Sequence, residues 1–140
     1  MNAFYQVLRW FFVALLFSTA IGKLLDIQGF AAVLHTYQLF IPYIVLAPLG
    51  LGISLFELVL GTALIARVQL RLCALLLILM HSGYVILAVI TNLRGLELDN
   101  CGCFGVFLAR PMTWITVVED IVLTVLSALL YWTVTRKAEK

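Results

Sequence analysis

Residues 43–66 read YIVLAPLGLGISLFELVLGTALIA, and this stretch decides the fold. A bilayer core is crossed by about 20 consecutive apolar residues in a helix, and this run is longer and carries only Glu57 as a charge. Gly50, Ser54 and Gly61 form a stripe of small residues, which favours close packing of helices in membranes. The stretch is therefore predicted to span a membrane and to pack against neighbouring helices.

The whole chain has the composition of an integral membrane protein. Hydrophobic residues make up 64% of its 140 residues and charged residues 11%, whereas soluble domains are roughly half apolar and a quarter charged. Four spans of about 20 residues nearly fill this length, so residues 1–140 are expected to form a single membrane domain that sits in the lipid bilayer. The formal net charge of +2 is too small and too scattered to indicate nucleic-acid binding.

The predicted fold class is all-α, an integral membrane four-helix bundle. The other three spans are expected at about 5–25, 72–92 and 113–133. Residues 27–39 are too short to span and carry apolar residues at helical spacing, so they predict a short interfacial helix between the first two spans. A polar cysteine loop, predicted over 93–112, joins the last two spans and holds two of the three cysteines.

The distribution of Lys and Arg predicts the orientation in the membrane. Six of these residues lie on the side of the two termini and three on the side of the cysteine loop. The first group is Arg9, Arg67, Arg71, Arg136, Lys137 and Lys140, and the second is Lys23, Arg94 and Arg110. The positive-inside rule then predicts a multi-pass protein of the bacterial inner membrane, with both termini cytoplasmic and the cysteine loop outside. Disulfides persist on that outer, periplasmic side.

The cysteine loop contains the sequence DNCGCFG at residues 99–105. Two thiols one residue apart, Cys101 and Cys103, can close a strained disulfide, and strained, exposed disulfides exchange electrons readily. Gly102 suits the backbone of a tight ring, and Gly105 leaves room for a partner backbone to approach. The loop is therefore predicted to be exposed and to carry out redox chemistry. Two other interpretations stay open: a pair of buried inert thiols, and a soft-metal site that uses both thiolates.

The third cysteine, Cys73, lies at the opposite end of the third span. About 20 helical residues, near 30 Å of rise, separate it from the loop, so it cannot pair with the other two. It is expected to be a core thiol.

Charged residues inside the spans are candidates for proton handling or for helix pairing. Glu57 is either a functional acid or the structural partner of Arg9, which is expected at a similar depth. Lys23, Thr116 and Glu119 are expected to form one polar cluster beneath the cysteine loop. Such a cluster would take up the proton that a thiol releases when it becomes a nucleophile, or it would fix the helix register.

Two histidines are also considered. His35 lies on the polar side of the interfacial helix, facing the same side of the membrane as the cysteines, and it is a candidate base toward a thiol or a solvated surface residue. His81 lies in the middle of the third span and is expected to be a hydrogen-bonded core histidine.

In the order of these features the chain resembles the MauE/DoxX group of four-span, redox-associated membrane proteins, and the methylamine-utilisation MauE type most closely. The similarity covers nearly the whole chain. It rests on Gly22 at the end of the first span, on Phe30, Tyr37, Pro42, Glu57 and Gly61, and on the box Cys101-Gly102-Cys103-Phe104-Gly105, its most specific part. The resemblance implies a periplasm-facing thiol site that works beside thioredoxin-like proteins in the maturation or redox maintenance of exported proteins. Members often place an acid directly before the first cysteine, where this chain has Asn100.

Three functions follow from this. The first is a thiol-disulfide oxidoreductase whose cysteine pair exchanges electrons with a thioredoxin-fold or other exported partner. A quinone coupled to it would have to react at this pair, because the chain has no second pair to pass electrons onward. The second is a copper-binding module that uses both thiolates with His35 or Met112. The third is an accessory subunit of a larger membrane complex, in which the cysteines staple a loop.

Overall fold

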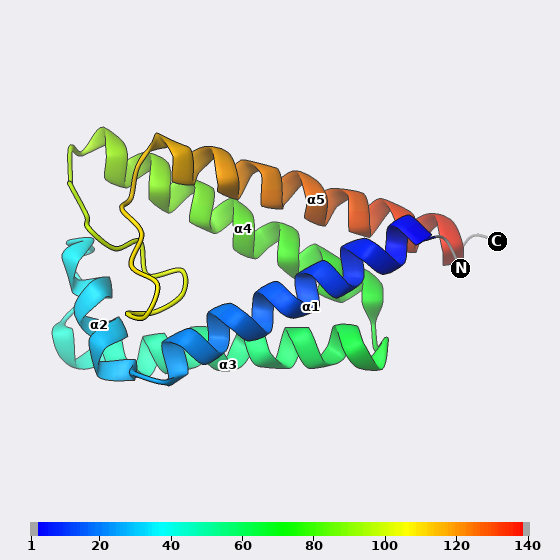
Figure 1. The fold of residues 1–140 in the computed structure, drawn as a ribbon, viewed down its shortest axis with the longest axis horizontal. Coiled ribbons are helices and arrows are strands. Elements are labelled where there is room, and N and C mark those ends of the chain that lie inside the picture. The colour runs from blue at the N-terminus through cyan, green and yellow to red at the C-terminus, as the bar shows by residue number, and fades with distance from the viewer. Residues whose placement is uncertain (1–2, 139–140) are drawn as a thin grey trace.

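The computed structural model describes residues 3–138, and the side chains of residues 3–136. The helices are α1 (Ala3–Leu24), α2 (Ile27–Thr36), α3 (Tyr43–Ala66), α4 (Leu70–Leu93) and α5 (Trp114–Ala138), and the described residues contain no strand (Figure 1). In α1, α3, α4 and residues Trp114–Arg136 of α5 the helix is long and apolar enough to cross a membrane. The all-α fold with four spans is therefore confirmed.

The short helix α2 ends earlier than the range 27–39 expected from its sequence pattern. Asp26 begins the helix, because its carboxylate accepts a hydrogen bond of 2.8 Å from the backbone N–H of Gly29. The backbone turns left-handed at Gln38 and Phe40, and a helix cannot continue through such residues. The chain then enters α3 directly after Pro42.

The four long helices form two pairs. Helix α1 packs along α3, and α4 packs along α5, over most of their lengths. The two pairs meet at the end that holds the start of α1 and the end of α5, and they diverge toward the other end (Figure 1). We call these the closed end and the open end. Helix α2 and the cysteine loop, residues 94–113, fill the open end.

The closed end has an apolar core. Its buried residues come from all four long helices and are Tyr5, Leu8, Phe12, Val13, Leu16, Leu60, Leu64, Cys73, Ala74, Leu77, Leu130 and Val134. Arg9 is buried beside them, and its Nη1 donates a hydrogen bond of 3.2 Å to the carbonyl oxygen of Leu64. Its guanidinium also lies over the rings of Tyr5 and Trp10. The core thus holds Cys73 at the far end of α4 from the cysteine loop.

The small residues of α3 let two neighbouring elements approach it closely. A Cβ atom added to Gly50 would come within 2.8 Å of the Phe30 ring in α2, and one added to Gly61 within 2.9 Å of the Phe17 ring in α1. The stripe predicted from the sequence therefore positions both α1 and α2 against α3.

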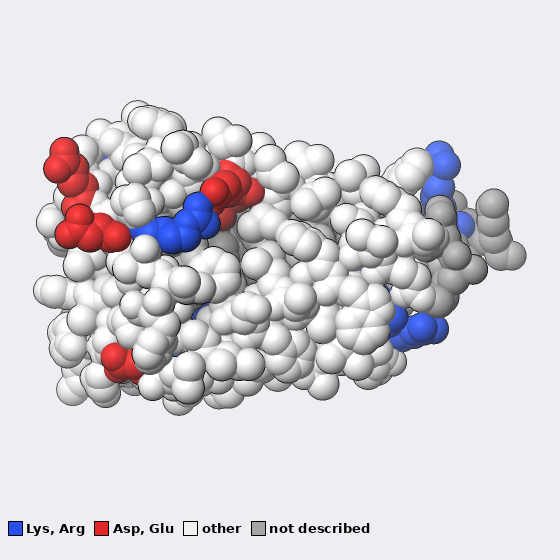
Figure 2. Space-filling view, in the orientation of Figure 1, with Lys and Arg blue, Asp and Glu red and all other residues white. Residues whose placement is uncertain are grey.

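Charged side chains lie toward the two ends of the molecule. Figure 2 shows Lys and Arg at the closed end, the visible acids together with a further basic side chain toward the open end, and an uncharged surface between them. This distribution fits a protein whose middle part is surrounded by lipid. Lys140, which was counted in the charge asymmetry, lies outside the described residues, as does the side chain of Lys137.

Candidate functional site

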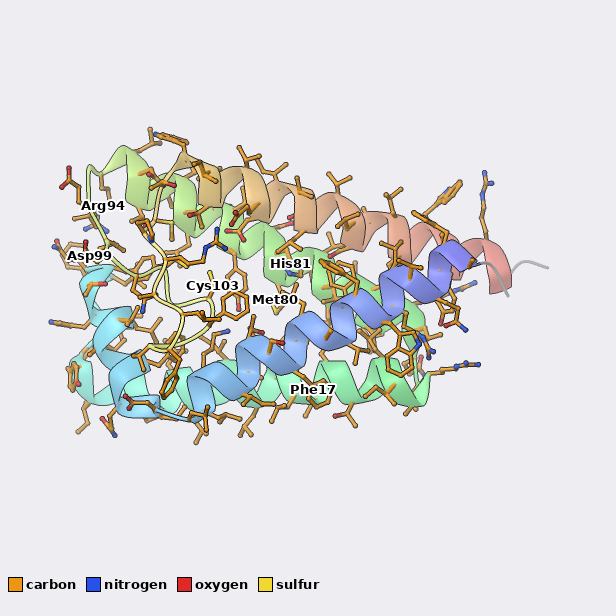
Figure 3. The ribbon with its side chains drawn as sticks, viewed as in Figure 1. Phe17, Met80, His81, Arg94, Asp99 and Cys103 are labelled. Carbon is orange, nitrogen blue, oxygen red and sulfur yellow. The ribbon has the colours of Figure 1, made fainter. Side chains whose placement is uncertain are left out.

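The cysteine loop folds back into the open end of the bundle. Cys101 is only 8% exposed and Cys103 is half-buried, and Cys103 lies between the helix pairs on the same cavity as Met80 (Figure 3). The loop is closed on itself by a hydrogen bond of 2.9 Å from the backbone N–H of Met112 to the carbonyl of Leu98. The prediction of an exposed loop is therefore wrong for the segment that holds the cysteine pair, although Asp99 and residues 107–111 of the loop are exposed. The diverging helix pairs leave an apolar space, and Leu98, Cys101 and Met112 of the loop pack into part of it.

Helix α2 and the end of α4 hold the loop in this position. The hydroxyl of Tyr37 donates a hydrogen bond of 2.5 Å to the carbonyl oxygen of Cys101. Arg94 Nη1 donates a hydrogen bond of 2.9 Å to the carbonyl of Tyr37. Burial and the nearby thiols raise the pKa of Tyr37, so its hydroxyl stays protonated and remains a donor.

Asn100 shapes the turn that carries the two cysteines. Its Nδ2 donates to the carbonyl of Gly105 at 3.0 Å, and its Oδ1 accepts from the backbone N–H of Gly102 at 2.9 Å. An ionised aspartate at this position could accept the second bond but could not donate the first. The amide therefore fits this turn better than an acid would.

The loop backbone lies directly against the end of α1. Gly105 has a φ of +69°, and a Cβ atom there would clash with the carbonyl of Gly22. A Cβ atom on Gly22 would in turn clash with the carbonyl of Phe104. Gly105 was expected to leave room for a partner backbone, but the backbone that approaches it is that of α1 in the same chain. Phe104 contacts α1 through its backbone carbonyl.

The two thiols of the pair are hydrogen-bonded to each other. The structure has both as free thiols, with their Sγ atoms 3.0 Å apart. When Cys101 loses its proton, the thiol of Cys103 donates to the Cys101 thiolate and lowers the pKa of Cys101 to about 6, and the nearby Arg110 charge acts in the same direction. The same bond, together with burial, raises the pKa of Cys103. The hydrogen bond and the nearby charges therefore favour ionisation of Cys101 over Cys103.

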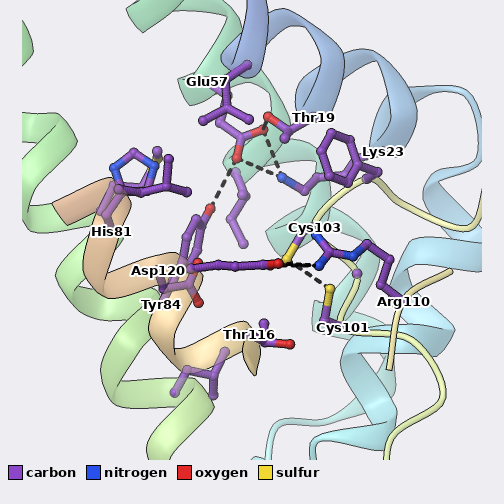
Figure 4. Close-up of a pocket in the computed structure, with 18 of the residues that line it drawn as sticks. Thr19, Lys23, Glu57, His81, Tyr84, Cys101, Cys103, Arg110, Thr116 and Asp120 are labelled. Atoms are coloured by element: carbon purple, nitrogen blue, oxygen red, sulfur yellow. Dashed lines mark hydrogen bonds and ion pairs between the residues drawn. The ribbon is translucent and has the colours of Figure 1, made fainter. Parts of the chain in front are cut away.

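A buried charge network lies beside the thiol pair (Figure 4). The carboxylate of Glu57 accepts hydrogen bonds from Lys23 Nζ at 2.7 and 2.9 Å, from the hydroxyl of Thr19 at 3.1 Å and from the hydroxyl of Tyr84 at 3.1 Å. Glu57 is 1% exposed and Lys23 is 3% exposed. A buried ion pair is tolerated when the remaining hydrogen-bonding capacity is filled in this way. The network joins α1, α3 and α4 at the open end.

The expected pairing of Glu57 with Arg9 is wrong. Along α1 the two basic residues Arg9 and Lys23 are 14 residues apart, about 21 Å at 1.5 Å per residue. Because α1 runs antiparallel to α3, Glu57 lies level with Lys23, while Arg9 lies level with Leu64.

Lys23, Thr116 and Glu119, which were expected to form one polar cluster, all line the same cavity but do not contact one another through hydrogen bonds in the described part of the chain. Thr116 donates to the carbonyl of Pro111 at the start of α5. Glu119 forms a salt bridge of 2.6 Å with Arg110 at the surface, where both side chains are nearly half exposed.

Of the two adjacent acids of the last span, sequence reasoning assigned Glu119 to the polar cluster, but Asp120 is the acid that faces inward. Asp120 is 6% exposed and lines the cavity beside Cys103 (Figure 4), and no described residue donates a hydrogen bond to its carboxylate. Its charge is one of the causes that raise the pKa of Cys103. The signal was its helical spacing to Thr116 and Ser127, two other buried polar residues of α5, because positions four and seven apart share a helix face.

The two histidines lie in different surroundings. His35 is exposed, packs edge-on against the Tyr43 ring at 5.6 Å, and is not among the residues that line the cavity with the cysteines. His81 is buried, with Nδ1 2.9 Å from the carbonyl of Leu77 and 3.2 Å from the hydroxyl of Ser127. The structure therefore brings His81 to the cavity wall and leaves His35 outside it.

A cavity of about 380 Å³ lies between the helix pairs at the open end. The two cysteines line it together with Asp120 and His81. The residues of the buried charge network also line it: Thr19, Lys23, Glu57 and Tyr84. Among the residues that the structure describes, no group of three His, Cys, Asp or Glu side chains could hold a metal ion. The arrangement suits proton and electron transfer at the thiol pair.

Comparison with protein families finds a match that covers most of the chain. The family described as "Methylamine utilisation protein MauE" matches residues 1–133. Neither the curated proteins nor the solved structures give a match.

Proposed function

The chain belongs to the MauE family of membrane proteins, and from this premise we propose that it is an accessory membrane protein of methylamine utilisation that carries out thiol-disulfide exchange. In this proposal Cys101 and Cys103 cycle between dithiol and disulfide, and their partner is a thioredoxin-fold or other exported protein. The observation that carries the proposal is the pair itself, two free thiols 3.0 Å apart with the pKa of Cys101 lowered to about 6. A lowered pKa increases the fraction of thiolate at neutral pH, and the thiolate is the reactive form.

The exchange uses each sulfur in a different role. The Cys101 thiolate attacks a disulfide of the partner and forms a mixed disulfide, which releases one partner thiolate. Cys103 then attacks Cys101 Sγ, its proton leaves to a base, and the second partner thiolate is released. The partner gains two electrons and the cysteine pair becomes a disulfide. The reverse reaction oxidises the partner and uses the same two sulfurs.

Access to the pair requires the cysteine loop to move. Cys101 is only 8% exposed, so a protein partner reaches it only when the loop shifts out of the open end. The side-chain contacts to be broken include the hydrogen bonds from Tyr37 and Arg94. The proposal therefore includes a partner that displaces the loop.

Trapping the mixed disulfide tests the proposal. In a Cys73→Ser background, Cys103→Ser should accumulate a covalent partner on Cys101, because the resolving sulfur is missing. The complex is detected as a reducible band on a non-reducing gel and identified by mass spectrometry. The matched control, Cys101→Ser with Cys103→Ser, should capture nothing. If Cys101→Ser and Cys103→Ser each kept full activity and neither captured a partner, the result would instead support an accessory subunit of a larger complex.

We also propose that both termini are cytoplasmic and that the cysteine loop faces the periplasm of a bacterial inner membrane. The support is the excess of Lys and Arg at the closed end. Asp99 and Arg67 are exposed at opposite ends of α4 and suit single-cysteine reporters in a chain that lacks the three native cysteines. A membrane-impermeant maleimide should label Asp99→Cys in intact spheroplasts and Arg67→Cys only after permeabilisation. The opposite labelling pattern would reverse the orientation.

A further inference from the structure

The cavity at the open end begins at the thiol pair. Cys101, Gly102 and Cys103 all line it, and its volume of about 380 Å³ falls within the roughly 300–1,000 Å³ of small-molecule sites. A ligand in this cavity would contact the sulfurs without any intermediate carrier. Because the chain has a single reactive cysteine pair, an electron acceptor must react at this pair directly. A ligand in the cavity would be placed to do so.

The cavity reaches the lipid-facing surface between α1 and α5. Phe11 of α1 and Val122 of α5 both line it, yet they are 42% and 50% exposed. Both belong to helix segments that cross the membrane, so the surface on which they lie faces acyl chains. The helices α1 and α5 belong to different pairs and diverge here (Figure 1). A ligand dissolved in the bilayer can therefore enter the cavity directly.

Most of the cavity wall is apolar, and two hydrogen-bond acceptors stand out in it. The carboxylate of Asp120 has no donor among the described residues. His81 Nδ1 faces the carbonyl of Leu77, which can only accept, so Nδ1 carries the proton and Nε2 is an acceptor. The hydroxyl of Ser127 near this Nδ1 is also bonded to the carbonyl of Leu123, which is consistent with that tautomer. A ring that carries hydroxyl groups would supply hydrogen-bond donors to this wall.

From these observations we infer that the cavity binds a lipid-soluble quinone, which oxidises the Cys101–Cys103 dithiol. The inference rests on the proposed redox function and adds its electron acceptor. In the reaction the two sulfurs lose their protons and form the Sγ–Sγ bond. The quinone gains the two electrons, and its two oxygens take up the two protons. The product is a hydroquinone, whose hydroxyl groups are the donors that Asp120 and His81 lack.

Single-turnover oxidation of the purified, reduced protein tests the acceptor. The protein carries Cys73→Ser, is kept in detergent without oxygen, and is mixed with decylubiquinone. Quinone absorbance and free thiols are followed together, and we expect one quinone reduced for each dithiol lost. Exchange of the same protein with glutathione disulfide is measured separately. Exchange without quinone reduction would overturn the inference and leave the proposed function standing, whereas loss of both reactions would overturn the proposed function.

Two variants of α5 test whether the quinone binds in this cavity. Val122→Trp places a large ring in the cavity mouth, whereas Val125→Trp places it on an equally exposed position, 53% exposed, that does not line the cavity. Val122→Trp should slow quinone reduction by at least about tenfold and leave exchange with glutathione disulfide unchanged. Val125→Trp should change neither rate. Equal slowing by both variants would place the quinone elsewhere.

A binding measurement separates occupancy from chemistry. The variant Cys101→Ser with Cys103→Ser cannot react, and decylubiquinone should still bind it and quench its tryptophan fluorescence. Adding Val122→Trp to this variant should weaken that binding, while adding Val125→Trp should not. Quenching that a saturated lipid removes as effectively as excess quinone would show that the cavity holds acyl chains only, and the inference would fail.

Discussion

The closed and open ends of the bundle are built from the same four helices, yet they differ in what lies between them. At the closed end the helix pairs touch and bury a continuous apolar core in which Phe12 and Leu77 have no exposed surface. At the open end the pairs diverge around a cavity, an ion pair, two thiols and an acid. One end of the four helices therefore contributes most of the apolar packing, and the other end holds the candidate site. The closed end supplies packing that allows the open end to stay hollow.

The largest expected effect comes from the ion pair of the open end. Lys23→Met leaves the buried carboxylate of Glu57 without a cation and should lower the free energy of unfolding in detergent by about 3–5 kcal/mol. Lys23→Met combined with Glu57→Leu should recover most of this loss. The control, Arg110→Met, breaks an exposed ion pair and should cost at most about 1 kcal/mol. Equal losses in Lys23→Met and Arg110→Met would contradict the buried network.

A pair of matched truncations tests the packing difference between the two ends. Leu77→Ala removes a fully buried side chain of the closed end and should cost about 2–5 kcal/mol, with thiol reactivity unchanged. Leu123→Ala removes a half-buried side chain that packs against the edge of this core and borders the cavity, so it creates less new empty space and should cost less. Thermal unfolding in detergent compares the two. A larger loss for Leu123→Ala would remove the distinction between the ends.

Two glycines with the same backbone conformation isolate the contact between α1 and the cysteine loop. Gly105 and Gly95 have φ values of +69° and +67°, so an alanine at either position is strained by about 1–2 kcal/mol. Only Gly105→Ala also clashes with Gly22, which should add about 1–3 kcal/mol and disturb the thiol pair. Gly95→Ala should leave thiol reactivity unchanged, because nothing lies within 4 Å of its added Cβ. Identical behaviour of the two variants would show that the loop does not rest on α1.

The last test concerns the reactivity of the open end rather than its stability, and it follows the titration of one thiol. In a Cys73→Ser background the rate of alkylation should rise with pH through about 6 and level off above it, because the thiolate of Cys101 is the reactive form. Cys103→Ala removes the hydrogen-bond donor, so the midpoint should move up toward the ordinary cysteine value, near 8.5. An unchanged midpoint in Cys103→Ala would mean that the neighbouring sulfur is not the cause of the lowered pKa.

Much of the fold could be predicted from the sequence because membrane spans are encoded locally. Each span is a long apolar run such as residues 43–66, and Gly50 and Gly61 indicated where helices would approach. The cysteine pair was likewise visible as a motif. Such features depend on composition and spacing within one segment, which a single sequence contains.

The contacts between segments could not be predicted in the same way. The partner of Glu57 depends on how far α1 slides along α3, and an estimate of depth selected Arg9 instead of Lys23. The choice between the adjacent acids Glu119 and Asp120 depends on the rotation of α5. Burial of the cysteine loop depends on the angle between two helix pairs, which no local pattern specifies.

The way the cysteine loop is anchored bears on the energetics of its sulfurs. Hydrogen bonds of Tyr37, Arg94 and Asn100 and the packing of Gly105 on Gly22 hold it, and none of these contacts involves a sulfur atom. In a thermodynamic cycle, the free energy by which a disulfide stabilises a fold equals the free energy by which the fold favours that disulfide over the dithiol. A ring of three residues constrains an unfolded chain very little, and the loop already has its shape without it. Neither oxidation state is then strongly favoured by folding, so the pair can be oxidised and reduced repeatedly at little cost to the stability of the fold.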